Sequence, residues 1–295
     1  MQDARVGSLL SLWRFPVKSM QGEPLTEAEV ESGGIIGDRA YGLIDRETGR
    51  VASAKSVKLF SRLFECRASF VEPPRTGAPA PPVSIELPNG ELVRSDHADC
   101  DRALSSFLGR EVTLASSAPP DYTIDNYLPD LEGNDPDGRR DVTVPVKLGA
   151  ALFAEIGRTS PVPASAFFDA FPLSLVTTST LAHLAGLQPA SRFEERRFRM
   201  NLTIDTDQGG FLENGWVRKE LGVGDGVRLR VRVPASRCVM TTLPQADLER
   251  DVGVLRALVE HNRLELGGRR YPCAGVFAVV LTPGRLRVGD PVALA

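Results

Sequence analysis

Apolar and polar residues alternate in short runs along the first third of the chain, and this period of two predicts strands rather than long helices. One strand is expected to end near Pro16, and two more should flank a turn at residues 47–49. The stretch PPVSIELPNGELVRS carries Asn89-Gly90 between two alternating runs, which predicts a hairpin that turns at this pair. ADCDRALSSFLGR has instead the pattern of a short helix, and Gly109 is expected to end it.

The acidic, loop-like residues 115–141 are the best candidate for a domain boundary. We therefore expect an N-terminal β-barrel domain over residues 1–120 and a second domain over residues 121–295. The second half is predicted to hold one helix, from about Ser179 to Gly186, and further strands. Two stretches there, LGVGDGVRLRV and LRVGDPVALA, share V-G-D-x-V and predict two strand entries of a barrel. The predicted fold is mainly β (α+β), with two packed β-barrel-like domains and a few short helices.

Composition and charge narrow the classes of partner. The 295 residues are 42% hydrophobic and 25% charged, as in ordinary globular proteins. A formal net charge of −3 provides no strong basic field, so neither nucleic acid nor an anionic membrane is an expected partner. No secretory leader is visible, and no apolar run approaches the ~18 residues of a membrane span. These observations predict a cytoplasmic protein.

Common catalytic and metal-binding motifs are absent from the sequence. The four cysteines, at positions 66, 100, 238 and 273, form no C-x-x-C pair, so neither a zinc ribbon nor a local iron–sulfur cage is expected. The chain has only three histidines, which disfavours hydrolases and zinc enzymes that use histidine as base or ligand. Phosphate-loop, dinucleotide-binding, zinc-protease and nucleophile-elbow motifs are not found either.

One cysteine has an unusual setting. The stretch RVRVPASRCVMTTLPQ alternates as a strand does until Pro234 breaks the pattern, and Cys238 follows beside Arg237. Most free cysteines are small packed hydrophobes, and that interpretation applies here too. The alternative is a thiolate that ligates a soft metal, a form that the neighbouring guanidinium would favour.

Further polar clusters interrupt the apolar strands, and each also has an ordinary interpretation. Charged residues at strand ends are usually solvated, and hydroxyls before a helix are usually caps. The alternation in FRMNLTI fits plain exposure of one strand face. Together, however, the clusters provide cations, amide and hydroxyl donors and a helix N-terminus that could bind an anion: Lys18, Ser19, Arg39, Thr177, Thr178, Arg199 and Asn201. This inventory suits a phosphorylated organic ligand that carries a soft metal.

In this order, the clusters resemble the motifs of the MOSC family (molybdenum cofactor sulfurase C-terminal domain). The resemblance is to its two-part members, which include the mitochondrial amidoxime-reducing component. FPVKS is similar to the family's Y-P-[VI]-K-S, GDRAYGLID to G-D-R-x-[WY], FRMNLTID to F-R-P-N-[IL], and SRCVMTT to S-R-C-x-x-T-T. GVFAVVLTPGRLRVGDPVAL is similar to the closing strands, so the resemblance runs from about residue 8 to the end.

The resemblance implies a molybdenum cofactor (Mo-molybdopterin) bound between the two domains, with Cys238 as the metal ligand and catalytic residue. The implied cofactor-binding positions are Lys18, Ser19, Arg39, Thr177, Thr178, Arg199, Asn201, Ser236, Arg237 and Cys238. The implied activity is two-electron reduction of small N-hydroxylated compounds, such as amidoximes, hydroxylamines and hydroxamic acids, with release of water. Met200 stands where the family pattern has proline, and TTLPQADLER replaces T-T-V-D-P, so the rim of the site is expected to differ.

The resemblance also bears on partners. Some relatives append a ferredoxin domain, whose cysteines this sequence lacks, so we expect electrons from a separate flavin, haem or iron–sulfur protein. Two other functions stay open. One is a carrier that binds the cofactor and hands it on without turnover, and the other is sulfur transfer. Pyridoxal phosphate is not expected, because no desulfurase domain is present in the 295 residues.

Overall fold

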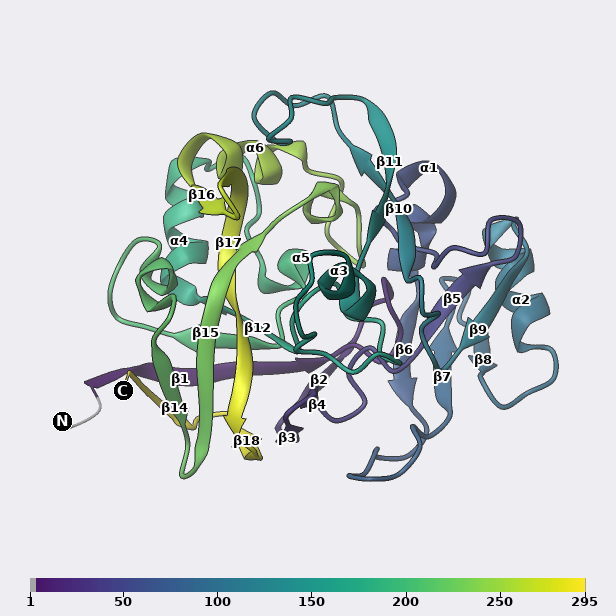
Figure 1. Cartoon of the computed structure of the whole chain (residues 1–295), viewed down its shortest axis with the longest axis horizontal. Helices are drawn as coiled ribbons and strands as arrows, with labels where there is room; N and C mark the ends of the chain where they lie inside the picture. The colour runs from purple at the N-terminus through teal and green to yellow at the C-terminus, as the bar shows by residue number, and fades with distance from the viewer. Residues whose placement is uncertain (1–3, 295) are drawn as a thin grey trace.

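Seven strands close into a barrel in the computed structural model, which describes residues 4–294 (Figure 1). Hydrogen bonding runs β12–β13–β1–β19–β14–β15–β17 and returns from β17 to β12; every pair is antiparallel except β12–β13. The strands are β1 (Ala4–Arg14), β12 (Leu173–Thr177), β13 (Leu202–Asp205), β14 (Glu220–Val223), β15 (Val227–Ser236), β17 (Arg269–Thr282) and β19 (Pro291–Leu294). The first strand of the chain therefore lies between two strands from its last third.

Along most of these strands every second residue is apolar and points inward, and these side chains fill the barrel. Its interior is apolar, and Leu9, Leu175 and Val231 are almost completely buried there. The two Gly-Asp repeats lie at strand entries of this barrel, before β15 and before β19, as predicted. Two short strands pair with barrel strands: β2 (Glu23–Leu25) with β1, and β16 (Arg263–Leu266) with β17. A separate sheet consists of β18 (Gly284–Arg287), β3 (Glu27–Glu31) and β4 (Gly34–Ile35), with β3 in the middle.

A second unit, with its own apolar core, is built from two small antiparallel sheets. They are β5 (Gly42–Asp45) with β9 (Val112–Ala115), and β6 (Arg67–Phe70), β7 (Val83–Glu86) and β8 (Leu92–Arg94). The predicted hairpin turn at Asn89-Gly90 is confirmed, between β7 and β8. α1 (Val57–Phe60), η1 (Ser61–Glu65) and α2 (Cys100–Leu108) complete the unit, and Gly109 ends α2 at φ 65° as expected.

The mainly β prediction is confirmed, but the second half holds more helices than the one predicted. The expected helix is α4 (Thr178–Leu187). The others are α3 (Gly149–Glu155), α5 (Glu195–Phe198), α6 (Val252–His261), η2 (Leu212–Trp216) and η3 (Val239–Thr242). The prediction of a loop over residues 115–141 is also wrong in part, because β10 (Thr123–Leu128) forms there and pairs with β11 (Val142–Lys147).

Two local predictions need correction. β15 continues through Pro234 to Ser236, because the register with β17 shifts at this point and accommodates the missing N–H. The strand expected over FRMNLTI begins only at Leu202. Arg199 ends α5 in the left-handed conformation, at φ 53°, so the alternation at residues 198–201 does not reflect a strand face.

Candidate functional site

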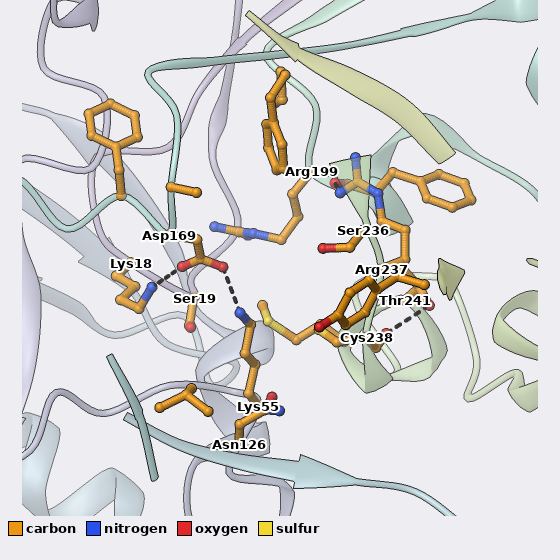
Figure 2. Close-up of a pocket in the computed structure, with 18 of the residues that line it drawn as sticks. Lys18, Ser19, Lys55, Asn126, Asp169, Arg199, Ser236, Arg237, Cys238 and Thr241 are labelled. Carbon is orange, nitrogen blue, oxygen red and sulfur yellow. Dashed lines mark hydrogen bonds and ion pairs between the residues drawn. The ribbon is translucent and has the colours of Figure 1, made fainter. Parts of the chain in front are cut away.

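A cavity of about 340 Å³ brings most of the predicted site residues together (Figure 2). Its lining comes from the stretches 18–55, 126–146, 167–174, 197–201 and 236–241, together with Tyr271 and Phe277 of β17. Of the ten predicted positions, the eight that line it are Lys18, Ser19, Arg39, Arg199, Asn201, Ser236, Arg237 and Cys238. Residues more than 200 positions apart in the sequence thus share one site.

The two threonines predicted for the site do not line the cavity. Thr177 is the N-cap of α4: its hydroxyl accepts from the Thr180 N–H at 3.2 Å and donates to the Glu213 carboxylate at 2.6 Å. The Thr178 hydroxyl donates to Asp205 at 3.0 Å. The Thr177 hydroxyl therefore caps the helix, which is the ordinary interpretation of such a residue, whereas the Thr178 hydroxyl ties the start of the helix to the end of β13.

Cys238 lies two residues beyond β15, at the N-cap of η3, and lines the cavity. Its side chain is partly exposed, whereas the other three thiols are buried. Burial raises the pKa of Cys66 to about 12 and that of Cys100 and Cys273 to about 11. The Thr241 hydroxyl donates to the Cys238 carbonyl at 3.1 Å and fixes the turn. Cys238 is thus the one thiol of the described chain that a ligand in this cavity can reach.

Arg237 was expected to favour a thiolate at its neighbour, and the structure gives its guanidinium a positioning role. It donates to the carbonyls of Ala274 and Phe198, both at 2.9 Å, and to the Met200 sulfur at 3.0 Å. Burial lowers its pKa to about 10, so it remains charged at neutral pH. Arg237 therefore ties the end of β15 to the turn that carries Arg199, and Met200, the departure from the family pattern, takes part in this tie.

Two guanidinium groups enclose an aromatic ring at the cavity. Arg39 lies 4.3 Å and Arg199 4.4 Å from the centroid of Phe15. Arg39 is paired with Asp38, at 2.5 Å. Arg199 has no carboxylate partner among residues 4–294, and one of its nitrogens donates to the Met20 carbonyl. Burial, with Arg39 nearby, lowers the pKa of Arg199 to about 9, so at neutral pH Arg199 is a half-buried cation that Asp38 and Asp169 attract without a direct ion pair.

The Asp38 carboxylate connects Arg39 with the backbone of Phe15 and the side chain of Asn201. This fully buried carboxylate accepts from the Phe15 N–H at 2.7 Å and from the Asn201 amide at 2.8 Å, in addition to Arg39. The amide oxygen of Asn201 accepts from the N–H and the hydroxyl of Ser174, at 3.1 and 3.0 Å. Asn201 borders the cavity, but its amide group is paired with protein and locks β12 to the start of β13.

The sequence did not point to a second charged group in the cavity, a carboxylate between two ammonium groups. Asp169 accepts from Lys18 at 2.5 Å and from Lys55 at 2.7 Å (Figure 2). Burial alone would raise the pKa of Asp169, but the two lysines outweigh it and hold the pKa well below its usual range. Burial lowers the pKa of Lys18 to about 8. Burial is also the largest single effect on Lys55, but the charge and hydrogen bond of Asp169 together with the charge of Cys238 outweigh it and raise the pKa. A lone acid in the apolar stretch FFDAFP was the only signal in the sequence.

The charges around the cavity are strongly unbalanced. Two carboxylates, Asp135 and Asp169, line it together with seven cations: Lys18, Arg39, Lys55, Arg139, Arg197, Arg199 and Arg237. The chain as a whole has a formal net charge of −3, so this concentration of positive charge is local. Such a cavity favours an anionic ligand, and guanidinium groups suit phosphate oxygens in particular.

Three of the cavity residues have an unusual backbone. Ser19 has φ 64°, and Arg39 and Arg199 each have φ 53°, in the left-handed region that non-glycine residues rarely adopt. Strained residues of this kind persist where the surrounding contacts fix them, and they cluster at ligand sites. Two of the three strained residues, Arg39 and Arg199, are thus also among the cations of the cavity.

Family models match both parts of the chain. The model of the MOSC domain matches residues 163–293, and that of the MOSC N-terminal beta barrel domain matches residues 6–64. The chain belongs to the MOSC family. The two matches lie on either side of residue 120, although the division into domains at that point stays a prediction.

Named relatives of this MOSC protein include two from human. Mitochondrial amidoxime-reducing component 1 is 25% identical over 311 residues, and component 2 is 24% identical over 307 residues. Each alignment covers 98% of this chain and 83% of the relative. Among solved structures, the YUAD protein from Bacillus subtilis is similar over 98% of this chain and 95% of that chain, with 11% identity and a TM-score of 0.45.

In the described part of this MOSC protein, residues 4–294, every helix is too short or too polar to span a bilayer.

Proposed function

We propose that this MOSC protein binds a molybdenum cofactor and reduces N-hydroxylated compounds with electrons from a separate redox protein. One observation carries the proposal: the accessible thiol, Cys238, lines the same cavity as a set of cations. A thiolate is a ligand for a soft metal, and the cations suit a phosphorylated pterin. The similarity to two amidoxime-reducing components supports the choice of substrate.

The residues present fit such a cofactor. A volume of about 340 Å³ falls within the ~300–1,000 Å³ of small-molecule sites. The guanidinium of Arg199 is half-buried and makes no direct ion pair among residues 4–294, and a charge removed from water is costly unless something pairs with it. A phosphate would supply that partner. Cys238 adds the soft donor that the three buried thiols do not offer.

Five cavity residues would then each have a defined role in binding or catalysis. Cys238 would hold the metal, and Arg199, Arg39 and Lys18 would neutralise the phosphate and orient the pterin. Arg237 keeps the turn with Arg199 fixed to the strand that carries Cys238. When bound, the cofactor supplies two-electron chemistry at oxygen: the N–O bond breaks, and with two electrons and two protons the oxygen leaves as water. Lys18, whose pKa is about 8, can hold or release a proton near neutral pH.

The protein purified with a molybdenum-loaded cofactor tests the proposal. We expect close to one molybdenum per chain and steady reduction of benzamidoxime to benzamidine by an artificial electron donor. A carrier would contain molybdenum without turnover, and a sulfur-transfer protein would move sulfur without reducing benzamidoxime. Absence of molybdenum after expression in a cofactor-producing host would contradict the proposal itself.

Replacing Arg199 by alanine is expected to lower cofactor occupancy about tenfold or more, because charge-assisted contacts contribute ~1.5–3 kcal/mol each. Molybdenum and phosphate content per purified chain is the measurement. Arg192→Ala is the matched control, since its side chain is 58% exposed and pairs only with surface carboxylates. Full occupancy in Arg199→Ala, equal to that of the control, would show that this guanidinium does not hold the cofactor.

A further inference from the structure

One amide at the cavity has no partner in the protein. The side-chain oxygen of Asn126 is buried and accepts no hydrogen bond from residues 4–294. Asn126 lines the cavity, and Figure 2 shows it beside Lys55, at the edge farthest from Arg199. A buried amide oxygen without a donor is unfavourable, because it has lost its water and gained nothing.

The residues that surround Asn126 on its face of the β10–β11 hairpin are apolar. Asn126 is paired with Val144 in the β10–β11 hairpin, so these two residues and Val146 and Leu128 lie on one face. All four line the cavity, and the other three are apolar. An aliphatic side chain at position 126 would suit such a face better than an amide. The amide is therefore best explained by a polar group that enters the cavity.

That group is separate from the anionic part of a ligand. Arg199 and Arg39 both contact the Phe15 ring, and Figure 2 shows Asn126 on the far side of Lys55 from Arg199. An amide offers a donor and an acceptor side by side rather than a charge. Its complement is a neutral group that also carries a donor beside an acceptor.

We propose that Asn126 is a specificity-determining residue that binds the amidine part of the substrate. The inference rests on the proposed function and assigns its substrate preference. In an amidoxime, an amino group and an oxime nitrogen share one carbon, so the asparagine oxygen accepts from the amino group while its amide N–H donates to the oxime. An oxime without the amino group leaves the asparagine oxygen unpaired. The site therefore selects amidoximes, and the valines and Leu128 contact the apolar remainder.

Benzamidoxime and benzaldoxime differ by this amino group alone, so their equilibrium binding to the cofactor-loaded protein tests the inference. By calorimetry, we expect wild-type protein to bind benzamidoxime about tenfold more tightly than benzaldoxime. Asn126→Leu should bring the two affinities within about twofold of each other, with unchanged molybdenum content. The same substitution should raise the melting temperature of the cofactor-free protein, because it removes an unpaired amide from an apolar face.

Two further variants keep the result interpretable. Asn126→Ala should lose the preference as well, which covers the case in which leucine disturbs the hairpin. Thr143→Leu alters the exposed face of the same hairpin and should change neither the affinities nor their ratio. A preference that persists in both Asn126 variants, no benzamidoxime binding to wild-type protein, or loss of molybdenum from Asn126→Leu would each overturn the inference. Wild-type protein that shows the preference without turnover would contradict the proposed function and leave the role of Asn126 standing.

Discussion

Cys238→Ser protein is expected to show no detectable reduction of benzamidoxime while keeping its fold. Cys238 is the cysteine side chain that lines the cavity, and a serine hydroxyl is a poor substitute for a soft thiolate ligand. The exchange of sulfur for oxygen changes the volume little, so the surrounding turn, held by Thr241, should persist. Turnover with an artificial donor and molybdenum content are the measurements, and circular dichroism reports the fold.

Cys273→Ser is the matched control. Cys273 lies on β17 opposite Ser236, which is two residues before Cys238, but its side chain is fully buried. Its thiol donates to the Tyr271 carbonyl at 3.3 Å, and Cys273 does not line the cavity. We expect this variant to retain molybdenum and most of its turnover, with some loss of stability. An inactive Cys273→Ser beside an active Cys238→Ser would show that the metal ligand has been assigned to the wrong cysteine.

The second large effect that we expect is a loss of folding stability when Asp38 is replaced. Asp38→Ala should lower the free energy of unfolding by about 3–5 kcal/mol, because it leaves a nearly buried guanidinium without its counter-ion. The Phe15 N–H and the Asn201 amide lose an acceptor in the same step. Urea unfolding of the cofactor-free protein measures the change without any contribution from a ligand.

Asp96→Ala provides the comparison. Asp96 pairs with Arg94 on the surface, where both side chains are about 40% exposed, and such pairs contribute little. We expect the unfolding curve of this variant to overlay that of the wild type. Equal curves for Asp38→Ala and Asp96→Ala would mean that the carboxylate under Arg39 is not structurally required.

The features that could be predicted from the sequence depend on local physics. The strand that ends near Pro16, the Asn89-Gly90 turn and the Gly109 helix end follow from neighbouring residues alone, and the structure confirms them. The errors occur where distant contacts override local preference. Pro234 stays in β15 because a shift in register against β17 absorbs it, and residues 123–128 form a strand because residues 142–147 pair with them.

The site residues also divide into those that the local sequence indicates and those that depend on distant contacts. Short clusters containing a cation or a thiol pointed to eight residues that the fold brings to one cavity. Thr177 looked similar in sequence, yet its hydroxyl is used by Thr180 and Glu213. Asp169, Lys55 and Asn126 gave no usable signal, because their importance comes from partners, or from a missing partner, that only the folded chain defines.

The place of β1 between β13 and β19 has a consequence for biosynthesis. β1 is made long before its partners β13 and β19, so the barrel cannot close until residues 291–294 have emerged. Until then β1 exposes apolar residues and unpaired backbone, which is the condition under which nascent chains need chaperones. Lys18 and Ser19 follow β1 directly, and Cys238 follows β15 in the same barrel. A ligand that needs both sides of the cavity must therefore enter after residue 294 has been made.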